Sequence, residues 1–220
     1  MRCGAMVELK NISFRYGSEN TVSKYADCLR NINLTVKTGE FILLTGPSGC
    51  GKTTILRIIN GLIPQFYPGE VTGEIFIDGE SVKEHELYDT ALIIGTVFQN
   101  PRTQFYNVDT TGELAFGCEN RGLSKQEIYA RIDSTVADFH MGVLMDRSIF
   151  RLSDGEKQKI ACASVNVSEP KIILLDEPSA NLDYDSTLML RKLILRWKSE
   201  GKTIIAAEHR IAYQIGRAHV

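Results

Sequence analysis

The chain has 220 residues and a net charge of −2, with 43% hydrophobic and 24% charged residues. This is the composition of an ordinary globular protein with room for one well-cored domain and an inserted subdomain. No basic cluster supports nucleic-acid binding, and no apolar run approaches the ~18 residues that span a bilayer. A membrane role would therefore require a partner protein.

Short strands dominate the beginning of the chain. The segments Val7–Phe14, Ile32–Val36 and Phe41–Thr45 are rich in apolar and β-branched residues and are separated by polar turns. Further along, Glu74–Asp78 alternates apolar and polar side chains, and the Asp-Gly pair at its end is a strong turn signal. These segments predict an antiparallel β layer on the N-terminal side of the fold.

A phosphate-binding loop follows the third of these segments. It matches the pattern G-x-x-x-x-G-K-[ST], continues through Thr54 into an apolar helix, and consists of Gly46, Pro47, Ser48, Gly49, Cys50, Gly51, Lys52 and Thr53. Its glycines let backbone N–H groups point at phosphates, and the helix N-terminus adds partial positive charge. We expect Lys52 to reach the β- and γ-phosphates of ATP and the Thr53 hydroxyl to bind Mg²⁺.

A helical subdomain is expected from about residue 100 to residue 167. Two capping boxes start helices there, one formed by Ser124 and Glu127 and the other by Ser153 and Glu156. Before the subdomain, the apolar run Leu92–Ile94 is predicted to be a buried strand.

The apolar strand Ile172–Leu175 ends in two carboxylates. Asp176 is suited to hold Mg²⁺ through water, and Glu177 is placed to polarise an attacking water as general base. A second apolar strand, Thr203–Ala207, lies beyond a helical stripe formed by Leu190, Leu193, Ile194 and Trp197. Strand, helix and strand in this order predict a parallel sheet that is buried on both faces.

The segment Leu152-Ser153-Asp154-Gly155-Glu156-Lys157-Gln158 resembles the signature of ATP-binding cassette (ABC) ATPases, usually written LSGGQ or LSGGE. Other landmarks of that family fall in order over residues 7–210, namely an adenine-stacking Tyr16, a Q-loop Gln99, a D-loop at 179–183 and a switch His209. The resemblance implies an α/β fold, with a P-loop NTPase (RecA-like) core, an N-terminal antiparallel β layer and an inserted α-helical subdomain.

In the ABC family two cassettes pair head to tail, and the signature of one caps the nucleotide of the other. The resemblance thus implies that nucleotide is contacted across the pair by Ser153, Gly155, Glu156 and Asp183. It implies catalytic roles for Lys52, Gln99, Glu177 and His209, and Mg²⁺ binding by Thr53, Gln99 and Asp176. Asp154 departs from the usual glycine, and we expect its charge to weaken the site that this signature completes.

Three segments, Phe98–Phe105, Glu113–Gly117 and Ala207–Arg210, resemble the ATPases of energy-coupling factor (ECF) transporters. This resemblance implies a second ABC ATPase subunit or cassette, a transmembrane transporter component, a place at the cytoplasmic face of the membrane, and the import of vitamins or metal ions. Residues 60–64 and 107–109 also resemble tandem members with two cassettes in one chain. The alternatives are a soluble ABC ATPase acting on nucleic acid or ribosomes, and a P-loop kinase, which would lack the signature.

The predicted ABC ATPase domain covers residues 6–214. The last six residues, 215–220, match the translation of a common sequencing adapter. We therefore expect a non-native tail there and a domain whose C-terminal end is truncated near Gln214.

Overall fold

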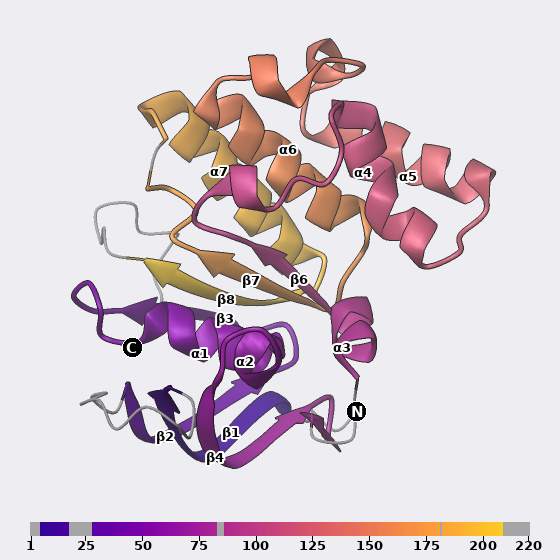
Figure 1. Cartoon of the computed structure of the whole chain (residues 1–220). Helices are drawn as coiled ribbons and strands as arrows, with labels where there is room; N and C mark the ends of the chain where they lie inside the picture. Colours follow the sequence, from indigo (N-terminus) through magenta and orange to yellow (C-terminus); the bar gives the residue numbers. More distant parts are fainter. Residues whose placement is uncertain (1–4, 18–27, 83–85, 181, 209–220) are drawn as a thin grey trace.

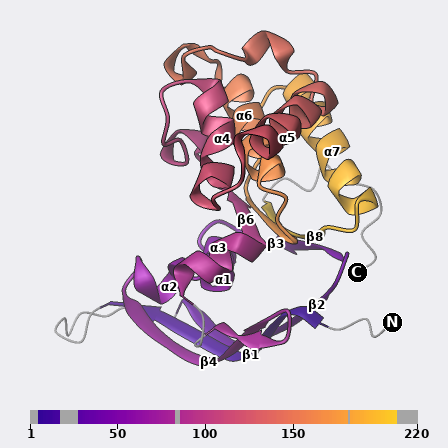
Figure 2. The same cartoon turned by 90° about the vertical axis from the view of Figure 1, so that its right-hand side faces the viewer.

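The computed structural model describes residues 5–17, 28–82, 86–180 and 182–208. Two sheets lie one above the other with short helices between them, and longer helices cover the far side of the upper sheet (Figures 1 and 2). The expectations for residues 209–220, which include the non-native tail, lie outside the described residues. The predicted domain bounds remain predictions.

The lower sheet is antiparallel, with strand order β2-β1-β4-β5. Its strands are β1 (Ala5–Tyr16), β2 (Leu29–Lys37), β4 (Gly69–Ile77) and β5 (Glu80–Ser81). Leu9 of β1 lies opposite Leu34 on one side and Ile75 on the other. The predicted antiparallel layer is confirmed, although β4 begins five residues before the predicted segment because β1 continues to pair with it as far as Gly69.

The upper sheet is parallel, with strand order β3-β8-β7-β6. Its strands are β3 (Phe41–Thr45), β6 (Ile94–Val97), β7 (Ile172–Asp176) and β8 (Thr203–Glu208). Alternate residues of β7 pack into two different apolar clusters, one on each face of the sheet, because side chains along a strand point to opposite faces. Ile172 and Leu174 pack toward the antiparallel sheet, whereas Ile173 and Leu175 pack toward the longer helices.

Helices α1 (Lys52–Ile59) and α2 (Leu62–Gln65) lie between the two sheets (Figure 1). Buried residues of α1 join β1, β2 and the near face of the parallel sheet in one apolar cluster. The start of α1 is thereby held at the carboxyl end of β3, which is where ligands bind in sheets of this type.

The helical layer on the far side of the parallel sheet consists of α4 (Thr110–Asn120), α5 (Lys125–Asp138), α6 (Asp154–Val167) and α7 (Tyr184–Ser199) (Figure 2). Within it α6 contacts β6, and α4 and α5 pack on α6. Three 3₁₀ turns connect this layer, η2 (Pro101–Thr103), η3 (Gly142–Leu144) and η4 (Ile149–Arg151). Both predicted capping boxes start their helices, α5 and α6. The stripe predicted on α7 is buried, and the indole N–H of Trp197 donates to Asn166 Oδ1 of α6 at 2.7 Å.

The predicted strand Leu92–Ile94 is wrong over its first two residues. Helix α3 (Leu87–Ile93) runs through them, and β6 begins only at Ile94. Glu86 and Asp89 form a reciprocal capping box that starts this helix. The capping residues therefore decide the local structure more strongly than three consecutive apolar residues do.

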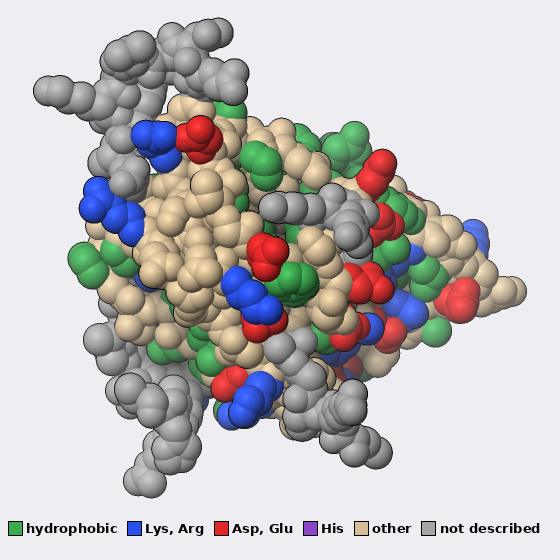
Figure 3. All heavy atoms as spheres, turned by 90° about the horizontal axis from the view of Figure 1, so that it is seen from below, with side chains coloured by type: hydrophobic (Ala, Val, Ile, Leu, Met, Phe, Trp, Pro, Cys, Tyr) green, Lys and Arg blue, Asp and Glu red, His purple; other side chains and the backbone are tan. Residues whose placement is uncertain are grey.

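No helix in the described part of the chain is long and apolar enough to cross a membrane. On the face seen from below in Figure 3, Lys and Arg side chains lie among Asp and Glu side chains. Ion pairs among the described residues include Lys10–Glu8 at 3.1 Å and Lys171–Asp78 at 2.7 Å. Charges of both signs therefore lie side by side on this face.

Candidate active site

The phosphate-binding loop joins β3 to α1. Gly51, the residue before α1, has a φ of 97°, and a Cβ there would lie 2.6 Å from Cδ2 of Leu29. Only glycine fits a position that is both left-handed and this crowded, so the loop curls tightly before the helix begins at Lys52. The packing of Leu29 on the loop was missed by sequence reasoning, because no local pattern links β2 to residues 46–53.

Lys52 forms hydrogen bonds with the backbone of the phosphate-binding loop. Its side chain is buried, and Nζ donates hydrogen bonds to the carbonyl oxygens of Gly46 at 2.9 Å and Pro47 at 3.2 Å. The three residues Ser48, Gly49 and Cys50 are exposed on the outer side of the loop. The ammonium group is therefore held by two carbonyl oxygens at the start of the loop, while residues 48–50 remain exposed to a ligand.

Thr53 and Asp176 meet although 123 positions separate them in the sequence. Thr53 Oγ1 donates to Asp176 Oδ1 at 2.8 Å, and Asp176 is only 6% exposed. Burial raises the pKa of the Asp176 carboxyl, against smaller lowering effects from Thr53 and nearby cations. A hydroxyl and one carboxylate are hard oxygen donors that suit Mg²⁺, which takes its remaining ligands from water and phosphate.

Glu177 follows β7 in a left-handed conformation, with a φ of 45°. Its backbone N–H donates to the carbonyl oxygen of Ala207 in β8 at 2.9 Å, which fixes the turn. The side chain accepts a hydrogen bond from Gln99 Nε2 at 2.9 Å. The structure therefore brings the predicted general base and the predicted Q-loop glutamine into direct contact, which the sequence could not show.

The signature lies at the N-terminus of α6. Ser153 Oγ accepts from the Glu156 N–H at 3.2 Å, and the Glu156 carboxylate accepts from the Ser153 N–H at 2.8 Å. The Ser153 hydroxyl keeps its own proton for donation to a ligand. A Cβ on Gly155 would lie 2.6 Å from Ser186 Oγ, so this position also faces the first turn of α7.

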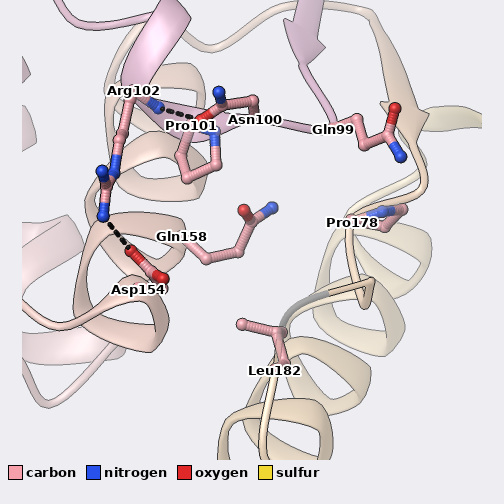
Figure 4. Close-up of a pocket in the computed structure, with 8 residues that line it drawn as sticks. All are labelled: Gln99, Asn100, Pro101, Arg102, Asp154, Gln158, Pro178 and Leu182. Atoms are coloured by element: carbon pink, nitrogen blue, oxygen red, sulfur yellow. Dashed lines mark hydrogen bonds and ion pairs between the residues drawn. The ribbon is translucent and has the colours of Figure 1, made fainter.

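The Asp154 side chain is exposed but paired with cations. Its Oδ1 accepts from Arg102 NH2 of η2 at 3.0 Å, as Figure 4 shows, and Lys157 Nζ lies 3.7 Å away. The pKa of the Asp154 carboxyl is lowered, chiefly by the Arg102 hydrogen bond and charge. Arg102 was missed by sequence reasoning because the pair spans 52 positions.

The D-loop connects β7 to α7. Asp183 is the N-cap of α7 and accepts from the Ser186 N–H at 2.8 Å. Hydrogen bonds from the side chain and the backbone N–H of Ser186 lower the pKa of the Asp183 carboxyl. Ser179 donates through its hydroxyl and its N–H to Glu208 Oε1 at the end of β8. Glu208 was not among the predicted site residues.

A cavity of about 470 Å³ opens between the Q-loop segment, the signature helix and the D-loop (Figure 4). It is lined by Gln99, Asn100, Pro101, Arg102, Asp154, Gln158, Pro178 and Leu182. Three segments that sequence reasoning assigned separately therefore share one cavity.

Tyr16 lies at the end of β1 and beside α1. Its hydroxyl is 3.1 Å from Thr54 Oγ1, and its ring packs edge-on against Phe14 with centroids 4.6 Å apart. Cys28 Sγ also lies 3.3 Å from Thr54 Oγ1. The predicted adenine-stacking residue is thus anchored to the helix that follows the phosphate-binding loop, whereas the involvement of Cys28 was not predicted.

The predicted residues form two groups. One joins the phosphate-binding loop to Asp176, Glu177 and Gln99 through the bonds above. The other is the signature, residues 153–156, whose hydrogen bonds and ion pairs within the described chain do not reach that loop. His209, the predicted switch histidine, lies outside the described residues.

Comparisons with known proteins agree with this arrangement. Residues 29–180 match the family described as ABC transporter. An ABC transporter ATP-binding protein of Treponema denticola is 50% identical over 208 residues, which cover 94% of this chain and 42% of that protein. One of Pyrococcus abyssi is 38% identical over 216 residues, 97% of this chain and 75% of that protein. The chain therefore spans well under half of the Treponema relative.

Two solved structures are also similar. The cbiO1 structure of Clostridium perfringens, described as part of the ABC transporter complex cbiONQ, has a TM-score of 0.80 and 29% identity over 96% of this chain and 80% of that chain. The dimeric bacterial ABC transporter cassette MJ0796 has a TM-score of 0.80 and 26% identity over 94% of this chain and 90% of that chain. The matched family, the identity to the relatives and the shared α/β fold lead to one conclusion: this chain belongs to the ABC transporter ATP-binding family.

Proposed function

We propose that this chain binds and hydrolyses MgATP as one of two cassettes that close over nucleotide, and that it powers an ECF-type importer of vitamins or metal ions. The observation that carries the catalytic part is the junction of Lys52, the Thr53–Asp176 pair and the Gln99–Glu177 pair at the carboxyl ends of β3, β6 and β7. The transport part is supported by the likeness to cbiO1, which belongs to a transporter complex.

In this proposal each predicted site residue has a role in binding or hydrolysing ATP. The backbone of residues 46–53 and Lys52 bind the triphosphate, and Tyr16 stacks on the adenine. Thr53 and Asp176 hold Mg²⁺, which supplies neutralising charge to the phosphate oxygens. Glu177 accepts a proton from the attacking water, and Gln99, in contact with it, registers whether the γ-phosphate is present. His209 orients the same water.

A second cassette completes the site. The N-terminus of its α6, with Ser153 and Gly155, provides a hydroxyl, backbone N–H groups and a helix dipole for the γ-phosphate. Hydrolysis removes the group that both cassettes share, so the pair opens. The proposal holds whether the second cassette is a separate subunit or lies further along the same polypeptide. A multi-span membrane component docks on the pair at the cytoplasmic face of the membrane.

The catalytic part is tested with Glu177→Gln in the full-length protein. We expect the rate of ATP hydrolysis to fall by about 10²- to 10⁴-fold, because the general base is lost, while ATP stays trapped between closed cassettes during rapid gel filtration. Glu169→Gln, an exposed acid at the far end of α6, is the matched control and should hydrolyse normally. A Glu177→Gln protein that neither retains ATP nor loses activity would contradict the proposal.

The transport part is tested by purifying the tagged, Glu177→Gln full-length protein from its own membranes. We expect a multi-span membrane protein to be recovered with it in stoichiometric amount. Recovery of ribosomes or nucleic acid in its place would support the soluble ABC ATPase and refute the transporter assignment.

A further inference from the structure

Two carboxylates lie in the first turn of α6, and each contacts an arginine from another segment. Arg102 pairs with Asp154 at 3.0 Å, and Arg147 pairs with Glu156 at 3.3 Å. Glu156 completes the capping box through the Ser153 N–H. Asp154, in contrast, occupies the position where the ABC signature usually has glycine. Its shortest hydrogen bond comes from Arg102, which lies outside α6 in η2.

Asp154 is ionised at neutral pH, as an aspartate ordinarily is. Arg102 and, to a smaller extent, Lys157 lower the pKa of its carboxyl further. In the proposed function the N-terminus of α6 meets the triphosphate of a facing cassette. A carboxylate next to Ser153 would repel that triphosphate, and the guanidinium of Arg102 provides the compensating charge.

The Arg102 side chain reaches Asp154 along one side of the cavity, so the carboxylate is bound to η2 of the same chain (Figure 4). The two side chains are 63% and 55% exposed. Exposed ion pairs of this kind contribute little to folding, so this pair is poorly explained as a stabilising contact.

A local hydrogen bond holds the backbone at Arg102. Asn100 is the N-cap of η2, and its Oδ1 accepts from the Arg102 N–H at 3.0 Å. At the other end of the same segment, Gln99 contacts Glu177. One short segment therefore touches the predicted general base with one residue and the signature with another.

From these contacts we propose that Arg102 is a positioning residue for the signature: it neutralises Asp154 and turns its carboxylate away, which allows the start of α6 to accept the triphosphate of the facing cassette. This inference rests on the proposed function. The expectation that Asp154 weakens the site stays a prediction, and on this inference the contact with Arg102 offsets that weakening.

A double-mutant cycle on the full-length protein tests the inference. The variants are Arg102→Gln, Asp154→Gly and the two together, each in the Glu177→Gln background, and the measured quantity is the ATP concentration that gives half-maximal retention of ATP. Arg102→Gln alone should raise that concentration by about three- to tenfold, because it removes the closer of the two cations beside Asp154 and leaves only Lys157 at 3.7 Å. With Asp154→Gly already present, the same change should alter it less than about twofold.

Three further measurements separate positioning from a general structural effect. Arg102→Lys should keep most of the affinity, since it keeps the positive charge, and the effect of Arg102→Gln should shrink as salt is raised. With Glu177 intact, Arg102→Gln should raise the KM for ATP and leave kcat nearly unchanged.

The matched control is the Arg131–Glu169 pair, at 3.2 Å. Glu169 follows the C-terminal end of α6, and the helix of 14 residues is about 21 Å long at 1.5 Å per residue. Arg131→Gln should therefore leave the ATP requirement unchanged.

The outcomes distinguish a failure of the Arg102 inference from a failure of the proposed function. If Arg102→Gln has the same effect with and without Asp154, or no effect at all, while the Glu177→Gln parent still retains ATP, the inference is overturned and the proposed function stands. If the parent never retains ATP, the proposed function fails and the inference fails with it.

Discussion

Replacing Asp176 by asparagine tests the reasoning about the metal-binding residues most directly. The substitution keeps the size of the side chain and an oxygen that can accept the 2.8 Å hydrogen bond from Thr53, but it removes the charge. Because the carboxyl is buried and its pKa is raised, the charged form opposes folding when no cation is bound.

The size of the effect follows from two opposing contributions. Burying a carboxylate costs several kcal/mol after relaxation, and a hydrogen bond to a charged acceptor returns about 1.5–3 kcal/mol. Asparagine avoids the first and keeps a weaker form of the second, although its new N–H groups need acceptors. We expect Asp176→Asn to be about 1 kcal/mol more stable than the parent at neutral pH without Mg²⁺, which raises Tm by about 2–4 °C.

The pH dependence gives the sign of the effect. A raised folded-state pKa means that the contribution of Asp176 to stability is present in acid and is lost as pH rises through that pKa. The difference between variant and parent should thus be small at about pH 4 and grow toward about pH 8. Urea unfolding of both proteins across this range, with the exposed Asp133→Asn as control, measures it.

Activity should change in the opposite direction. MgATP hydrolysis by Asp176→Asn should fall by about 10- to 100-fold, and addition of MgATP should stabilise the parent more than the variant. A variant that is less stable than the parent at every pH, or one that hydrolyses MgATP at the parental rate, would refute the assignment.

Gly155→Ala should cost less than about 1 kcal/mol of stability, because the clash with Ser186 Oγ is relieved by rotation of a small side chain, yet ATP retention in the Glu177→Gln background should fall. Rescue of retention by adding Ser186→Ala would show that packing, and not the approach of the backbone to phosphate, requires glycine. At neutral pH a maleimide should label the exposed Cys50, which ATP should protect, and spare Cys162, because burial raises the pKa of that thiol to about 12. Mass spectrometry of the folded protein checks this, and labelled Cys162 would contradict it.

Several elements could be predicted because their causes lie within a few residues. The phosphate-binding loop, the capping boxes at Ser124 and Ser153, and the apolar strand before Asp176 all have this local origin. The prediction for Leu92–Ile94 failed for a local reason too, because the capping box at Glu86 was overlooked.

The sequence by itself determined the chemical groups of this protein and the order in which they occur: a loop for phosphate, a strand ending in two acids, and a signature helix. Only the tertiary structure decided which of these groups meet. Thr53 reaches Asp176, Gln99 reaches Glu177, and Arg102 reaches Asp154 because the parallel sheet and the helices packed on it bring distant segments to one edge. Hydrogen bonds and ion pairs act over a few ångströms of space, whatever the number of residues between the partners, so a linear pattern cannot specify them.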